Sequence, residues 1–241
     1  MCHGVNSNNN QSYSIKYPVK GLVFSTFITV AACTLSLFSP QSDAAASTQT
    51  TQQTPAINRD GVKVWTYKLA GNPALSYQAS TLLNSSVSQT LALIMNHKTA
   101  PDWAPYVRLI EVISPLSREG VMIYRMEIDL PFPLTDRDVV IRSELKQQKT
   151  GEVVLENIAI NDTRAPEREG LVRIKHYQGS WQLRMLTPTQ LELRTEGYAD
   201  LGGAIPVSFS NLFVTQQPYQ MLVNLRRYLQ ENTPSGLASS F

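Results

Sequence analysis

The segment from Met122 to Leu130 constrains the fold most, because apolar side chains recur at every second position and charged ones stand between them. A period of two predicts a strand with one apolar face and one face in water. Two prolines between 131 and 134 interrupt this pattern, since proline has no backbone N–H for a sheet, and polar turn residues follow at 135–138. A second strand is predicted from Val139. The segment therefore predicts two strands joined by a corner.

Similar extended runs, separated by turn residues, fill most of the chain. Ser85 or Ser86 is placed to cap an amphipathic helix that ends before Pro101. A second helix is predicted from about Pro206 to Gln230, with Pro218 kinking or dividing it. The eighth strand is expected to follow a turn at Gly179-Ser180. The nine predicted strands lie at 62–67, 75–83, 107–113, 121–130, 139–147, 153–160, 171–177, 181–186 and 190–198.

These elements predict an α+β fold. Neighbouring strands are rotated by about 20 to 25 degrees, so a long antiparallel meander curls and its concave face needs a cover. The apolar stripe of the C-terminal helix makes that helix the predicted cover. The expected architecture is a curled antiparallel sheet of about nine strands around a long C-terminal helix. A cavity is expected wherever side chains do not fill the space between them.

Three motifs resemble the START (StAR-related lipid transfer) domain family in order and spacing. They are LPFPLTDRDVV at 130–140, EREGLVRIKHYQGSW at 167–181 and YADLGGAIPVSFSN at 198–211, and the resemblance extends over about 62–229. It implies the helix-grip fold, also called START/Bet v1-like, and a lipid or other hydrophobic ligand. The chain is similar to the phosphatidylcholine-transfer-like members of the family, as a bacterial and exported version.

The N-terminus has the pattern of a signal peptide. Lys16 and Lys20 precede an apolar run at 22–38, and small residues at 42–46 offer a cleavage site. The predicted organisation is a signal peptide at 1–46, a flexible linker at 47–60, the START-like domain at 61–232 and a disordered tail at 233–241. The expected location is the periplasm or the medium.

Two alternatives for the leader remain open. The apolar run is at the short end of a membrane-spanning helix, which would act as an uncleaved anchor. The residues before Cys33 resemble a bacterial lipobox, in which Cys33 would be acylated. Cys2 and Cys33 are the only cysteines, so the predicted mature chain has no disulfide and no thiolate site.

Sequence motifs for catalysis, metals or cofactors are absent. After the leader only His97 and His176 remain, without an HExxH, GxSxG or phosphate-loop pattern. A net charge of +2, without aromatic residues interleaved among basic clusters, gives no reason to expect a nucleic-acid partner. We therefore predict no catalytic residue, no metal site and no cofactor.

Arg137 permits two interpretations. Asp136 and Asp138 flank it, so all three can be turn residues whose charges answer one another. The resemblance instead implies that Arg137 lies in the ligand-binding region and holds a lipid phosphate with its planar donors. The full set of predicted ligand-binding residues is Arg137, Tyr124, Met126, Trp181, Phe209 and Phe213, and the predicted lid hinges are Gly202, Gly203 and Pro218.

Three classes of function remain open. The first is non-catalytic binding, or transfer, of a hydrophobic ligand by a monomer that contacts a membrane surface transiently. The second is an enzyme on the same fold, of a cyclase or dehydratase type, for which no convergent acid and base residues are visible. The third is an exported structural or interaction protein whose cavity is filled by its own side chains.

Overall fold

The computed structural model describes residues 54–68, 75–203 and 205–232. The predicted signal peptide, the first half of the predicted linker and the predicted tail lie outside these residues. None of the described helices is both long enough and apolar enough to cross a membrane.

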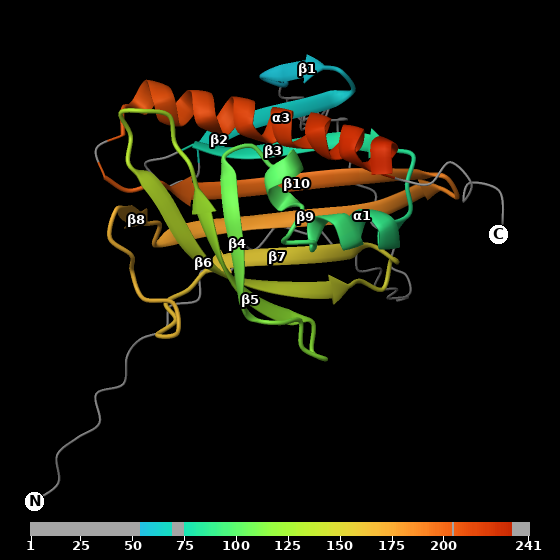
Figure 1. Ribbon diagram of the computed structural model, residues 1–241. Coiled ribbons are helices and arrows are strands. Elements are labelled where there is room, and N and C mark those ends of the chain that lie inside the picture. Colours follow the sequence, from blue (N-terminus) through green and yellow to red (C-terminus); the bar gives the residue numbers. More distant parts are fainter. Residues whose placement is uncertain (1–53, 69–74, 204, 233–241) are drawn as a thin grey trace, which may run out of the picture. The chain divides into compact units, whose positions relative to one another are not determined.

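Within the described residues, ten strands form one sheet, and three helices accompany it (Figure 1). The helices are α1 (Val87–Ile94), α2 (Ala100–Trp103) and α3 (Val207–Asn232). The strands are β1 (Ile57–Arg59), β2 (Val62–Lys68), β3 (Leu75–Leu83), β4 (Val107–Ser114), β5 (Val121–Ile128), β6 (Asp136–Gln147), β7 (Val153–Ala159), β8 (Leu171–Arg173), β9 (His176–Thr187) and β10 (Gln190–Asp200).

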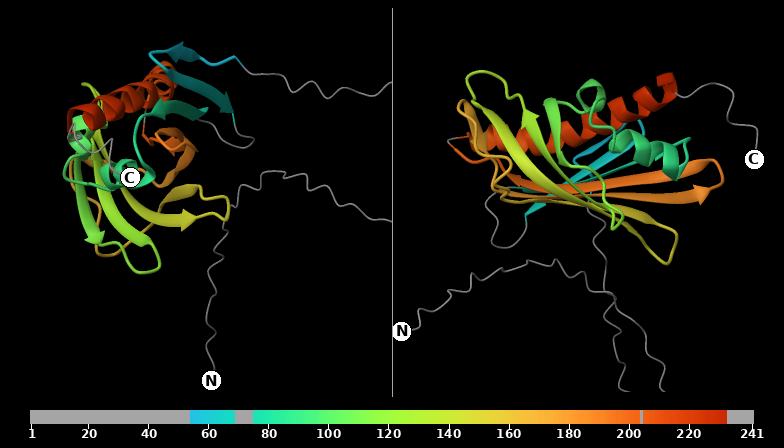
Figure 2. Two further views of the ribbon diagram at one scale, coloured as in Figure 1. Left: turned by 90° about the vertical axis from the view of Figure 1, so that its right-hand side faces the viewer. Right: turned by 60° about the horizontal axis from the view of Figure 1, so that its bottom comes forward.

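Nine strands follow one another across the sheet in the order β1-β2-β3-β10-β9-β7-β6-β5-β4, and every neighbouring pair is antiparallel. The short β8 lies off this path and pairs in parallel with β6. The sheet curls, and α3 lies along its open, concave side (Figure 2). This confirms the predicted α+β architecture of a curled antiparallel sheet around a long C-terminal helix.

The C-terminal half of α3 supplies the main core. Met221, Leu222 and Leu225 are buried against β2 and β3 and against leucines of β9 and β10. The helix continues through Pro218, so the prediction that Pro218 divides it is wrong. A proline inside a helix removes a single backbone hydrogen bond, and here the packing on both sides of Pro218 preserves the helical path.

The first helix begins as predicted, with a capping box. The Ser86 hydroxyl accepts from the backbone N–H of Gln89, while the Gln89 side chain accepts from the Ser86 N–H. Pro101 lies in the first turn of α2, a position where its missing N–H is not needed. This short second helix was not predicted.

Several strand boundaries differ from the prediction. The first strand, β1, lies within the predicted linker, so the folded part begins before residue 61. β6 begins at Asp136, so residues 136–138 are strand and not turn. β9 runs without interruption through Gly179-Ser180, which pair with Gly197 and Glu196 of β10. Glycine indicated a turn here, but in the structure it permits a close approach of side chains.

Candidate ligand-binding cavity

A cavity of about 270 Å³ lies between the concave face of the sheet, the α1–α2 region and α3. The apolar face of β5 forms one wall, because Met122, Tyr124, Met126 and Ile128 all line the cavity. This confirms that the period-two pattern of this segment marks an inward face. The remaining apolar lining includes Trp103, Val139, Leu155, Trp181, Phe213 and Met221.

Aromatic side chains border the cavity on both sides. Trp103 of α2 packs edge to face on Trp181 of β9, with ring centroids 6.3 Å apart. The Phe213 ring of α3 contacts Tyr106 at 5.2 Å and Phe209 at 6.1 Å. Four predicted ligand-binding residues, Tyr124, Met126, Trp181 and Phe213, line the cavity, whereas Phe209 packs beside them without lining it. Their contact with a ligand stays a prediction.

Arg137 lies elsewhere than either interpretation expected. It is 3% exposed in β6, and its side chain does not line the cavity. Nε donates to the Leu201 carbonyl at 3.1 Å, Nη2 to the Gly202 carbonyl at 3.0 Å, and Nη1 to the Thr135 carbonyl. Burial lowers the pKa of Arg137. The turn interpretation is wrong, because Arg137 lies in a strand. Phosphate binding by Arg137 stays a prediction, and three of its donors already bind backbone carbonyls.

The segment held by Arg137 contains the two predicted hinge glycines. Gly202 and Gly203 have φ angles of 62° and 67°, which favour glycine. The Gly202 N–H donates to Asp200 at 3.0 Å. A Cβ atom on Gly203 would lie 3.3 Å from Nη2 of Arg137. Both glycines line the cavity, so Arg137 positions the segment that leads into α3.

Three tyrosines lie together on the concave wall. Tyr77 of β3, Tyr124 of β5 and Tyr177 of β9 line the cavity. Burial raises the pKa of Tyr77 to about 12 and the pKa of Tyr124 and Tyr177 well above the usual range. Negative charge on Tyr124 or Tyr77 would raise the pKa of Tyr177 further. All three are uncharged at neutral pH.

Two glycines make room for these rings. Gly179 of β9 is opposite Gly197 of β10, which in turn is opposite Tyr77. A Cβ atom on Gly179 would lie 2.7 Å from the Tyr177 hydroxyl oxygen, and one on Gly197 would lie 2.8 Å from Cε1 of Tyr77. Paired glycines inside strands were the signal that could have located Tyr77 and Tyr177, which sequence reasoning missed.

A serine and an asparagine extend this polar wall. Ser143 of β6 lies opposite Asn157 of β7, and its hydroxyl donates to Oδ1 of Asn157 at 2.7 Å. Both residues line the cavity, and Asn157 is 3% exposed. Within the described part of the chain, the Asn157 amide nitrogen has no hydrogen-bond partner. Its N–H groups are therefore available to a molecule in the cavity.

The cavity lining contains no lysine or arginine among the described residues. The charges of Arg125 and Glu127 in β5 and of Asp138 in β6 alternate with the cavity-lining residues of these strands and so lie on the opposite face of the sheet. There Arg125 is 3% exposed, and its Nε lies 3.2 Å from Oδ2 of Asp138 in an ion pair without hydrogen-bond geometry. Arg173 donates two hydrogen bonds of 2.7 and 2.8 Å to the Asp138 carboxylate. Arg125, Asp138 and Arg173 therefore pair with one another on the outer face.

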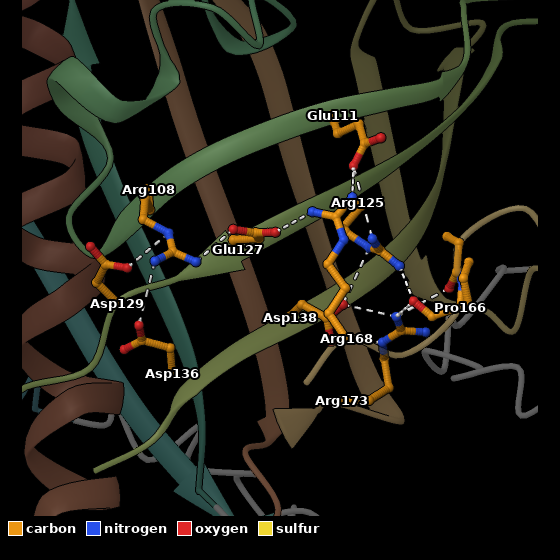
Figure 3. A network of polar contacts seen from close by, with 11 residues as sticks. Arg108, Glu111, Arg125, Glu127, Asp129, Asp136, Asp138, Pro166, Arg168 and Arg173 are labelled. Atoms are coloured by element: carbon orange, nitrogen blue, oxygen red, sulfur yellow. Dashed lines mark hydrogen bonds and ion pairs between the residues drawn. The ribbon is translucent and has the colours of Figure 1, made fainter. Parts of the chain in front are cut away.

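The same network covers the face that was expected to be in water. Glu127 is 5% exposed and accepts from Arg108 at 2.6 Å and from Arg168 at 2.7 Å. Arg168 also donates to Glu111 at 2.7 Å (Figure 3). The prediction of a water-facing side for 122–130 is therefore wrong for Arg125 and Glu127, which ion pairing buries, whereas Asp129 is exposed as predicted.

The two histidines after the predicted leader lie in different surroundings. His97 lines the cavity after α1, and His176 is exposed at the first position of β9. The described residues include no group of three or more His, Cys, Asp or Glu side chains that could hold a metal ion.

Comparisons with known proteins show a shared fold and low sequence identity. A scan against protein-family models finds no match. An uncharacterized protein of Pseudomonas aeruginosa is 28% identical over 172 residues, covering 71% of this chain and 83% of that protein. Phosphatidylcholine transfer protein of Rattus norvegicus is 25% identical over 130 residues, or 52% of this chain and 58% of the rat protein. The crystal structure of a StAR-related lipid transfer protein from Xanthomonas axonopodis matches with a TM-score of 0.67 at 22% identity, covering 73% of this chain and 98% of that one.

Proposed function

Because this chain is a START domain in fold, with distant sequence similarity to phosphatidylcholine transfer protein, we propose that it binds a lipid or another hydrophobic molecule in its cavity. The observation that carries the proposal is the cavity of about 270 Å³ with its largely apolar lining. Apolar concave sites with a few polar groups are typical of small-molecule binding. The proposal assigns no chemical step to the protein.

We propose that only the N-terminal part of α3 opens. Before Pro218, Phe209 and Phe213 are partly buried, and Leu212 is 58% exposed. After Pro218, Leu222 and Leu225 are completely buried in the main core. Segments with few buried contacts open at the smallest free-energy cost, so the part before Pro218 is the candidate lid and the part after it is the anchor.

Transient contact with a membrane surface fits the same end of the molecule. Phe132 is 97% exposed in the corner between β5 and β6, and Leu212 is exposed on the proposed lid. The corner and the start of α3 lie at the same end of the sheet (Figure 1). Exposed apolar side chains next to a cavity entrance favour contact with lipid. Replacing Phe132 by serine is expected to slow ligand exchange with vesicles and to leave folding unchanged.

The direct test of binding is extraction. The purified protein is extracted with organic solvent, and the extract is examined by mass spectrometry for bound lipid. A single lipid class at a near-stoichiometric amount would support the proposal. An empty extract, together with no uptake of lipid from vesicles, would favour a protein whose cavity has another role.

The lid is tested by a cleavable crosslink. Cysteines replace Tyr106 and Phe213, whose rings lie 5.2 Å apart, in a chain whose native cysteines are changed to serine. A short thiol crosslinker is expected to block ligand exchange, and cleavage to restore it. The Phe213→Cys single variant treated with the same reagent is the control. Equal exchange in the crosslinked and cleaved forms would mean that the ligand enters elsewhere.

Export remains a prediction, because residues 1–46 lie outside the described residues. The chain is expected to shorten by about 40 to 46 residues when it is pulse-labelled and chased in a bacterial host. Processing that disappears in Cys33→Ser would instead indicate a lipoprotein.

A further inference from the structure

Building on the proposed binding function, we infer that the cavity selects an uncharged lipid whose polar groups are hydroxyls or carbonyls, and that it discriminates against fatty acids and phospholipids. The polar part of the described cavity lining supports this selection, because it presents hydroxyl and amide groups and no lysine or arginine.

Two of the tyrosine hydroxyls are not used by the protein itself. In the region that the structure describes, neither Tyr124 nor Tyr177 forms a hydrogen bond with another residue. The Tyr77 hydroxyl differs, because it has a side-chain interaction with Thr195. This interaction lowers the pKa of Tyr77 and offsets part of the rise that burial causes. A phenolic hydroxyl both donates and accepts, so Tyr124 and Tyr177 can bind either a hydroxyl or a carbonyl oxygen.

Asn157 places a third available group beside them. Its strand, β7, lies between β6 and β9, and in the register of the sheet Asn157 is opposite Ser143 on one side and Gly179 on the other. The Tyr177 hydroxyl lies over the Cα atom of Gly179, where a Cβ atom would be only 2.7 Å from its oxygen. The Asn157 amide and the Tyr177 hydroxyl therefore lie on adjacent strands at the same level of the wall. Buried donors without a partner are costly, and a ligand oxygen would satisfy them.

The electrostatics of the wall oppose an anion. A carboxylate or phosphate in an apolar cavity is strongly disfavoured unless a cation pairs with it. The described residues around the cavity include no lysine or arginine that could pair with an anion, and the Asp200 carboxylate already accepts from the Gly202 N–H. The two buried arginines of β5 and β6 have partners in the protein: Arg137 directs three donors to backbone carbonyls, and Arg125 is paired on the outer face.

The size of the cavity favours a compact ligand. Ligand pockets commonly measure about 300 to 1,000 Å³, and this one, at about 270 Å³, is just below that range. A single acyl chain with a small uncharged head group suits this volume better than a lipid with two chains.

The test compares ligands that share one lauroyl chain and differ in the head group. The purified full-length protein is titrated at neutral pH with monolaurin, laurate, lauroyl lysophosphatidylcholine and dodecane. Trp103 and Trp181 line the cavity, so their fluorescence reports binding. Monolaurin is expected to bind at least about tenfold more tightly than laurate or the lysophospholipid, which corresponds to one unpaired charge or a pair of lost hydrogen bonds.

Hydroxyl deletions then identify the groups responsible. Tyr124→Phe and Tyr177→Phe are each expected to weaken monolaurin binding about fivefold, as for the loss of one hydrogen bond, without changing dodecane binding. Tyr67→Phe is the matched control, because Tyr67 lies in β2 and does not line the cavity. Asn157→Leu provides a further variant with a similar volume.

The outcomes separate this inference from the proposed function. If laurate or the lysophospholipid binds as tightly as monolaurin, the selection for uncharged lipid is wrong while binding in the cavity stands. The inference also fails if the tyrosine variants weaken monolaurin and dodecane equally. If none of the four ligands binds, dodecane included, the proposed function itself fails.

Discussion

The two faces of β5 and β6 differ sharply in chemistry, although residues of the two faces alternate along the same two strands. The outer face holds Arg125 and Asp138 in a buried ion-pair network (Figure 3). The inner face presents Tyr124, Met126 and Ser143 to the cavity. Because side chains alternate along a strand, neighbouring residues are sorted to opposite faces.

This difference separates stability from recognition. Charged partners on the outer face fasten the segment before β8 to the sheet, where Arg173 and Arg125 share the Asp138 carboxylate. The inner face keeps uncharged groups that the protein leaves available. Substitutions on the outer face should therefore act on folding, and those on the inner face should act mainly on the ligand.

The largest effect is expected for Asp138→Ala. Removing this carboxylate leaves Arg125 and Arg173 buried without their common partner. Breaking a buried ion pair from one side destabilises a protein by about 3 to 5 kcal/mol. Urea unfolding measures this loss. Arg184→Ala, which removes an exposed ion pair with Glu192, is the control and should change stability little.

A smaller effect is expected for Arg137→Ala. Charged donors to backbone carbonyls contribute about 2 to 3 kcal/mol, and their loss should also loosen the segment from Leu201 to Gly203. Ligand exchange should accelerate equally for monolaurin and for phospholipid. A selective loss of phospholipid binding would instead support the phosphate-binding role implied by the family resemblance.

On the inner face, Gly179→Ala is expected to destabilise the protein by about 1 to 2 kcal/mol through overpacking. The new Cβ atom would lie 2.7 Å from the Tyr177 hydroxyl oxygen. The double variant with Tyr177→Phe should recover part of the loss, since the ring carbon Cζ is at 3.2 Å. Thermal unfolding of the two single variants and the double variant decides. No recovery would mean that the ring does not lie above Gly179.

The smallest effect at neutral pH is expected for Tyr124→Phe, within about 0.5 kcal/mol, because its hydroxyl has no partner in the described chain. A larger difference between this variant and the unsubstituted protein is expected at alkaline pH. Folding raises the pKa of Tyr77 from 10.0 to about 12, and that of Tyr124 and Tyr177 also rises. The unfolded chain then loses these protons first, so stability should fall as the pH rises above about 10. Unfolding at several pH values should show a shallower fall in Tyr124→Phe, whereas equal slopes would contradict burial of Tyr124.

Local pattern was sufficient for several features of the site. The alternation in 122–130 identified Tyr124 and Met126 as inward-facing, and the apolar stripe of α3 identified Phe213. Ser86 was recognised as a helix cap from residue type and spacing. These features depend on neighbours within one element, and such neighbours are visible in the order of residues.

Features that depend on strand order were missed or misread. Gly179 and Gly197 are 18 positions apart in the sequence, but β9 and β10 place them opposite each other, beneath tyrosine rings. The turn interpretation of Arg137 failed because nothing near this residue in the sequence predicted that it would donate to the Leu201 and Gly202 carbonyls. The burial of Glu127 likewise needs Arg168, which comes from a distant segment.

The sequence by itself determined the α+β class, the inward face of 122–130 and the covering helix, since periodicity is a local property of the chain. The tertiary structure alone decided which polar groups meet. Curling of the sheet brings Tyr77, Tyr124, Tyr177 and Asn157 from four strands to one wall, and it leaves the arginines of β5 and β6 bound elsewhere. Electrostatic and hydrogen-bonding partners act over a few ångströms in space, and the distance along the chain does not reveal them.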